Sequence, residues 1–122
     1  MEEQYKELFY KLADALGWTN VVINNYKYAF FSGVFGTPAD WKERGMDEGM
    51  RCSMPNWIMD DGAALRLAVD HNLDIMSGSG GPVVSAYTLP TSGNAIYDEH
   101  EDRYTAWRIA IAKAVIAKLE RR

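Results

Sequence analysis

The sequence predicts an α+β fold, in which an antiparallel sheet of three to four strands packs between helices as an α/β/α sandwich. Apolar residues recur with helical spacing at both ends of the chain, and short apolar runs alternate with turn residues between positions 73 and 97. The connections between those runs are too short for parallel crossovers, so the sheet is expected to be antiparallel. At 122 residues, the chain fits a single domain, 1–122.

The composition is that of a globular protein, with 48% hydrophobic and 25% charged residues. The formal net charge is −4, and no basic stripe is present apart from the last few residues, which disfavours duplex nucleic acid as a partner. Cys52 is the only cysteine, which excludes an internal disulfide framework and suits a reducing compartment. Because no apolar run reaches about 20 residues and residues 1–17 lack a signal-peptide pattern, we expect a cytoplasmic protein that does not contact membranes.

The first helix is predicted to end at Gly17, which stands where a left-handed residue closes a helix. Apolar side chains recur before it at spacings of three and four: Tyr5, Leu8, Phe9, Leu12 and Leu16. The stretch 21–35 is rich in Val, Ile, Tyr and Phe around Asn24-Asn25. It fits two short strands (21–23 and 26–31) about an Asn turn, one longer bulged strand, or partly irregular structure packed through its aromatic rings.

The middle of the chain is predicted to contain two helices of different length. A turn at residues 36–41 leads into a short helix with Thr37 as N-cap and Pro38 as its first residue. The glycine-rich, mixed-charge residues 42–51 then form a long connection, which is either functional or mobile. Asp60-Asp61-Gly62 opens the second helix with an Asp N-cap.

Three short apolar runs then predict a three-stranded antiparallel meander, with strands at 73–76, 83–89 and 95–97. Glycine-rich and proline-containing turns separate them, at 77–82 and 90–94. The last helix is predicted to start after Asp102 and to run to about Glu120. Its broad apolar face suits either the central packing element of the fold or a subunit contact.

Two stretches resemble a known family. Trp57–Val69, which contains Asp60-Asp61-Gly62, and Arg103–Ile111 are similar to segments of small phage and prophage proteins of the phage ABA sandwich domain family, and Thr37–Trp41 resembles an element that precedes their central strands. The resemblance implies a sheet between helices and an uncharacterised accessory role, in the host cytoplasm if the protein is phage-encoded. It supplies no catalytic residues.

The clusters of acidic residues are predicted to cap helices. Asp60-Asp61 could bind a cation or act as acid and base, and the run Asp98–Asp102 around His100 could bind a cation. Capping and a solvated turn explain both patterns more simply. Cys52 lacks a His partner, His71 is expected to interact with the C-terminal dipole of its helix, and no hydrolase or metal motif is present. We therefore expect no catalysis, no metal site and no cofactor.

Aromatic rings, arginines and a glycine-rich loop are the remaining candidates for a binding site. The loop 77–81 could cradle a phosphate through its N–H groups, although it lacks the Lys-Ser/Thr of a P-loop, and a mobile hairpin loop is the favoured interpretation. Rings in the irregular region could line a pocket beside arginine side chains that contact an anion. The predicted ligand-binding residues are Trp41, Trp57, Arg66, Ser77, Gly78, Ser79, Gly80, Tyr104 and Arg108.

Three functions fit these observations. The first is a non-catalytic phage-type accessory binding protein that sequesters a small anionic, nucleotide-like immune signal as a counter-defence protein. The second is a protein-interaction module that inhibits or regulates a host factor, which would expose an apolar patch. The third is a small hydrolase that uses the acidic clusters. Homo-oligomerisation is expected, because the broad last helix and the open sheet edges both invite pairing.

Overall fold

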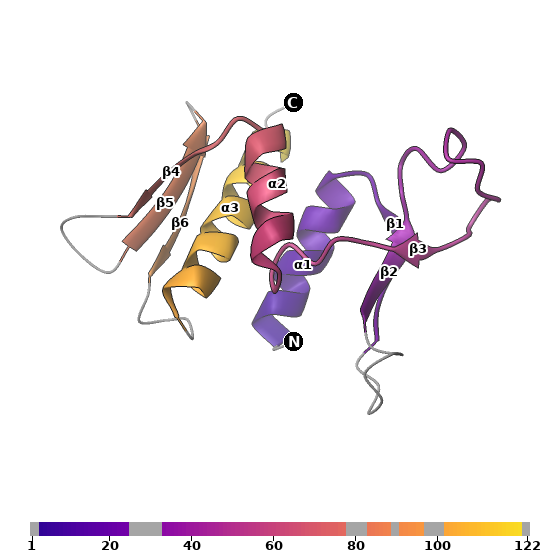
Figure 1. Cartoon of the computed structure of the whole chain (residues 1–122), viewed down its shortest axis with the longest axis horizontal. Coiled ribbons are helices and arrows are strands. Elements are labelled where there is room, and N and C mark those ends of the chain that lie inside the picture. The colour runs from indigo at the N-terminus through magenta and orange to yellow at the C-terminus, as the bar shows by residue number, and fades with distance from the viewer. Residues whose placement is uncertain (1–2, 25–32, 78–82, 89–90, 97–101, 121–122) are drawn as a thin grey trace. The chain divides into compact units, whose positions relative to one another are not determined.

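Figure 1 shows a computed structural model of the chain, which describes residues 3–24, 33–77, 83–88, 91–96 and 102–120. The elements in chain order are α1 (Glu3–Ala15), β1 (Thr19–Asn24), β2 (Gly33–Thr37), β3 (Cys52–Ser53), α2 (Asp61–Asp70), β4 (Asp74–Ser77), β5 (Val83–Thr88), β6 (Thr91–Ile96) and α3 (Arg103–Glu120). In the described part these form three helices and two antiparallel three-stranded sheets, so the predicted α+β class is confirmed.

The strands are divided between two sheets, whereas the sequence predicted one sheet of three to four strands. The chain forms two compact units, Met1–Pro55 with β1–β3 and Asn56–Arg122 with β4–β6. The α/β/α layering and the single domain over 1–122 stay predictions. Among the described residues, no helix is both long and apolar enough to cross a membrane.

The first unit begins with α1, which confirms the predicted first helix and its buried apolar stripe. The helix ends in a Schellman motif, in which Trp18 N–H donates to Ala13 O (2.9 Å) and Gly17 N–H donates to Asp14 O (3.0 Å). Gly17 has a φ of +89°, as the sequence predicted. A Cβ at this position would also lie 2.9 Å from the Cβ of Ala39. Backbone conformation and space therefore both require glycine here.

Two strands are described within the stretch 21–35, for which the sequence left three interpretations open. β1 pairs antiparallel with β2 from Asn24 opposite Gly33, and a register shift interrupts the pairing near the start of β1. Residues 25–32, which include the predicted strand 26–31, lie outside the described residues.

Residues 39–45 form successive turns without a helix, so the predicted short helix with Thr37 as its N-cap is wrong. Thr37 ends β2 and is buried. Its hydroxyl accepts a hydrogen bond from Asn20 Nδ2 (3.2 Å) and donates one to Met50 O (2.7 Å). Because this hydroxyl joins the two ends of the connection 38–51, it is not available to cap a helix.

The second unit contains the predicted meander, with strand order β4-β5-β6 and antiparallel pairing throughout. The third strand starts earlier than predicted, because Thr91 already pairs with Thr88. Only residues 89–90 connect the two strands, so the predicted turn at 90–94 is wrong for residues 91–94.

α3 begins directly after Asp102, as predicted, and packs against β5, β6 and α2. Half of its residues are buried. Beneath it Ala86 is fully buried and pairs with Gly93, and these small residues let a helix approach a sheet closely. Of the two roles predicted for the last helix, α3 therefore serves as the central packing element of its own unit.

Candidate functional site

A pocket of about 240 Å³ lies in the second unit between α2, α3 and β4. Each helix contributes side chains spaced three and four residues apart, which places them on one face. β4 contributes a single side chain. The lining residues are Asp61, Ala64 and Leu65 from α2, Ile75 from β4, and Tyr104, Trp107, Arg108 and Ile111 from α3.

The pocket has a buried floor and an exposed, apolar rim. Ala64 and Ile111 are buried, whereas Leu65 is 58% and Tyr104 63% exposed. Trp107 is half-buried between these extremes. Large apolar side chains that stay exposed on both sides of a pocket indicate a binding surface, because side chains that stabilise a core are buried.

The polar end of the pocket is an ion pair between Arg108 and Asp61. The guanidinium of Arg108 also donates from Nε to Ile58 O (2.6 Å) and from Nη2 to the Thr105 hydroxyl (2.9 Å). Its side chain is 11% exposed, whereas that of Asp61 is 69% exposed. The positive charge is therefore held inward by three partners, and the solvent-facing group at this end is a carboxylate.

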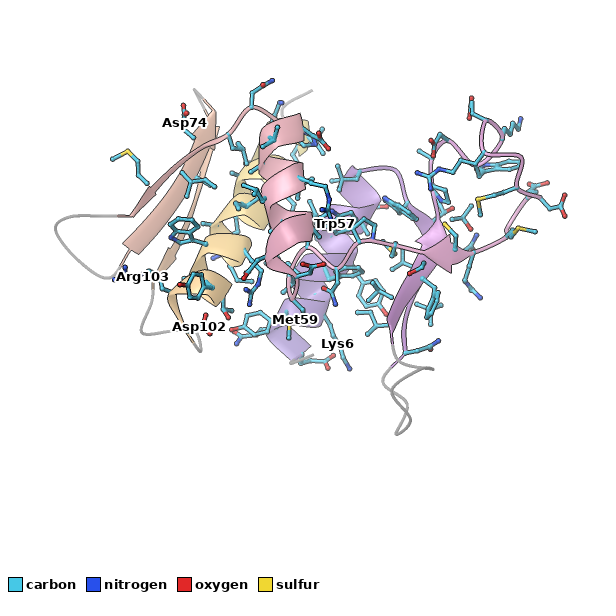
Figure 2. All side chains as sticks on the ribbon, in the orientation of Figure 1. Lys6, Trp57, Met59, Asp74, Asp102 and Arg103 are labelled. Carbon is cyan, nitrogen blue, oxygen red and sulfur yellow. The ribbon has the colours of Figure 1, made fainter. Side chains whose placement is uncertain are left out.

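The neighbouring acidic side chains cap helices, as the sequence predicted. Asp60 adopts extended backbone angles and accepts a hydrogen bond from Gly62 N–H (2.9 Å). Asp102, labelled at the start of α3 in Figure 2, accepts one from Thr105 N–H (2.7 Å). This backbone hydrogen bond is the main cause that lowers the pKa of Asp102, and the Thr105 hydroxyl and Arg108 add to it against partial desolvation. Residues 98–101 lie outside the described residues.

Of the predicted ligand-binding residues, Tyr104 and Arg108 meet in the pocket. Trp57, labelled in Figure 2, belongs to the same unit but is buried away from solvent, at 5% exposure. Arg66 lies on the exposed face of α2 and does not line the pocket. Trp41 lies in the first unit, with Lys42 Nζ 5.4 Å from its ring centre. Ser77 ends β4.

The predicted glycine-rich loop cannot be placed, since Gly78, Ser79 and Gly80 lie outside the described residues. Five apolar lining residues were not predicted as site residues: Ala64, Leu65, Ile75, Trp107 and Ile111. Their spacing assigns them to apolar stripes, and a stripe has the same periodicity whether a neighbour covers it or leaves it open. No sequence signal separates those two cases.

Comparisons with protein-family models, with curated proteins and with solved structures found no match to this chain. The resemblance to the phage ABA sandwich domain family therefore stays a prediction. Among the described residues, no group of three or more His, Cys, Asp and Glu side chains could hold a metal ion.

Proposed function

We propose that this chain is a non-catalytic binding protein, of the accessory kind that the phage resemblance implies, and that its binding site is the pocket between α2, α3 and β4. The observation that carries the proposal is a hollow whose lining is apolar except for one ion pair, next to exposed Leu65 and Tyr104. Convergent apolar walls with a single polar end are typical of sites that bind an apolar or aromatic group in one orientation.

The electrostatics favour a neutral or cationic ligand over an anionic one. Arg108 already donates to three acceptors, and the exposed group at the polar end is the Asp61 carboxylate. A phosphate placed there would meet a like charge. A nucleotide-like immune signal is therefore the less favoured form of this proposal, and an aromatic group with an amine or hydroxyl is the favoured one.

A protein-interaction module is the second candidate function. Val69, one helical turn after Leu65 on α2, is also exposed, at 67%. Together with Leu65 and Tyr104 it extends the apolar surface beyond the pocket, as a docking surface for a protein partner would require. In that case, the pocket would receive an apolar side chain of the partner.

A series of probes with the same ring and different charge tests the proposal. Tyramine, p-cresol and 4-hydroxyphenylacetate are titrated into the protein, and the indole N–H signal of Trp107 is followed by NMR after assignment with Trp107→Phe. We expect saturable shifts with millimolar affinity, in the order tyramine, then p-cresol, then 4-hydroxyphenylacetate.

Two variants distinguish an effect of the carboxylate in the pocket from an effect of the protein's overall charge. Asp61→Asn should abolish the preference for tyramine, because it removes the carboxylate at the polar end. Asp74→Asn is the matched control, since Asp74 is an exposed carboxylate of the same unit outside the pocket lining. If adenosine monophosphate shifts the Trp107 indole N–H signal at a lower concentration than tyramine does, the nucleotide form of the proposal would be favoured. No saturable shift with any probe would overturn the small-ligand proposal.

A further inference from the structure

Thr105 is a buried polar side chain beside the pocket. Among the side chains that the structure describes, Thr37 and Thr105 are the two polar ones that are buried, and Thr105 is 4% exposed. A buried hydroxyl costs free energy unless hydrogen bonds satisfy it, so valine, which has the same shape, would serve packing alone equally well. The Thr37 hydroxyl joins the ends of the connection 38–51. The partners of the Thr105 hydroxyl indicate a different role.

The Thr105 hydroxyl lies between two charged groups. Arg108 follows three residues later on the same face of α3, and its Nη2 donates to the hydroxyl (2.9 Å). A guanidinium only donates, so the hydroxyl accepts this hydrogen bond and keeps its own proton for another acceptor. That acceptor is the Asp102 carboxylate, which also accepts from Thr105 N–H (2.7 Å). Hydrogen bonds thus lead in one direction from Arg108 to the N-cap of α3.

These hydrogen bonds fix the direction in which Arg108 presents its N–H groups. Nε donates to Ile58 O (2.6 Å), Nη1 to the Asp61 carboxylate and Nη2 to Thr105. Arg108 lines the pocket, whereas Thr105 does not. The hydroxyl therefore holds the Nη2 side of the guanidinium toward α3. A carboxylate or phosphate group in the pocket would have to compete with Thr105 for these N–H donors.

We propose that the Thr105 hydroxyl determines which class of ligand the pocket binds. By holding Nη2 of Arg108 it disfavours carboxylate and phosphate groups, and it leaves the Asp61 carboxylate to receive hydrogen-bond donors. Thr105 is thus a positioning residue that acts through Arg108. The inference rests on the proposed function, because it names the ligands that the same pocket accepts and excludes.

Thr105→Val tests the inference, since it removes the hydroxyl and keeps the branched shape of the side chain. Tyramine and 4-hydroxyphenylacetate are titrated into this variant and into the unchanged chain, and the Trp107 indole N–H signal is followed by NMR. The ratio of the two dissociation constants should shift about tenfold toward 4-hydroxyphenylacetate, as expected for one hydrogen bond to a charged group. Thr105→Ser keeps the hydroxyl and should retain the preference for tyramine.

A matched control shows whether lost stability alone changes the ratio. Thr37→Val removes the other buried hydroxyl, in the first unit, and should leave the ratio unchanged. Thr105→Ala is the second variant without the hydroxyl, and it remains measurable if the valine variant does not fold, because alanine favours the helix. It should shift the ratio in the same direction as Thr105→Val.

The outcomes distinguish this inference from the proposed function. No saturable shift with any probe in the unchanged chain would overturn both. If the unchanged chain prefers tyramine and the variants without the Thr105 hydroxyl keep the same ratio, only the inference is overturned. It is also overturned if Thr105→Ser or Thr37→Val shifts the ratio as far as Thr105→Val, since the hydroxyl would then not be the cause.

Discussion

Arg108 links three separate parts of the second unit through one side chain. Its guanidinium donates to Ile58 O before α2, to the Asp61 carboxylate at the start of α2, and to the Thr105 hydroxyl within α3. Planar guanidinium groups suit this role because their five N–H donors point in fixed directions. The side chain that the sequence analysis assigned to ligand binding thus organises the polar end of the pocket.

Replacement of Arg108 should therefore destabilise the protein. Arg108→Ala leaves Ile58 O and Thr105 without this donor, and we expect the free energy of unfolding to fall by about 2–4 kcal/mol. Arg108→Lys keeps the charge but cannot reach three partners at once, so its loss should be intermediate. Urea denaturation measures both.

The matched control for this change is Arg44→Ala. Arg44 pairs with Asp40 at 2.8 Å, but both side chains are about half exposed. Removal of an exposed pair should cost less than about 1 kcal/mol. Equal losses for the two alanine variants would contradict the organising role of Arg108.

At the scale of the element, two glycines allow the cost of backbone strain to be separated from the cost of a steric clash. Gly17 has a φ of +89° and a Cβ there would lie 2.9 Å from Ala39, whereas Gly45 has a φ of +75° with open space around it. Gly45→Ala should therefore lose about 1 kcal/mol of unfolding free energy from backbone strain alone. Gly17→Ala should lose clearly more, since it adds the contact with Ala39. Equal losses in urea denaturation would mean that the connection 38–51 shifts freely away from α1.

The N-cap of α3 predicts a pH dependence of stability. The pKa of Asp102 is lower in the folded chain than its ordinary value, first because Thr105 N–H donates to it. Its contribution is therefore complete above the unfolded pKa of about 4, and is lost as the pH falls through the lower, folded pKa. Asp102→Asn can still accept the hydrogen bond but carries no charge.

The measurement is the Tm of both proteins between about pH 2.5 and 7. The unchanged protein should be more stable than Asp102→Asn near neutral pH, and the difference should close as the pH falls below about 4. A difference that stays constant down to the lowest pH would show that the charge of Asp102 does not contribute.

Local rules predicted the helices better than the connections. Helical periodicity, the Asp at the N-caps of α2 and α3 and the glycine at the C-terminus of α1 depend only on neighbours within a few residues, and the structure contains α1, α2 and α3 where these signals predicted them. The Thr37 N-cap was wrong because a partner 13 residues away, Met50 O, takes the hydroxyl. Sequence spacing carries no record of such long-range partners.

At the scale of the whole molecule, the candidate site was the least predictable part for the same reason. Tyr104 and Arg108 were among the predicted residues, because aromatic rings and arginines were the sequence's remaining candidates for a binding site. Asp61 and Ile58 O lie 47 and 50 residues from Arg108 in the chain. The pocket that they border exists only through the way α2, α3 and β4 pack, which no single segment specifies.

The two units should nevertheless unfold together. Boundaries between independent domains lie in exposed, flexible linkers. Here Met54 (5%) and Ile58 (0%) on either side of the boundary are buried, although Pro55 between them is exposed. Met54 N–H donates to Val34 O in the first unit, and Ile58 O accepts from Arg108 in the second. Only residues 55–57 separate the two anchored positions, so the connection is short, and we expect one cooperative transition, as the prediction of a single domain requires.

The four tryptophans allow this expectation to be measured, because Trp18 and Trp41 belong to the first unit and Trp57 and Trp107 to the second. Their indole N–H signals are followed by NMR through urea denaturation, and all four should share one midpoint. Arg108→Ala changes only the second unit, yet it should lower the midpoints of the first-unit signals by the same amount. If those signals keep their original midpoint in Arg108→Ala, the chain consists of two independently folding domains. The single domain over 1–122 would then be wrong, and the pocket would belong to a domain that starts near Asn56.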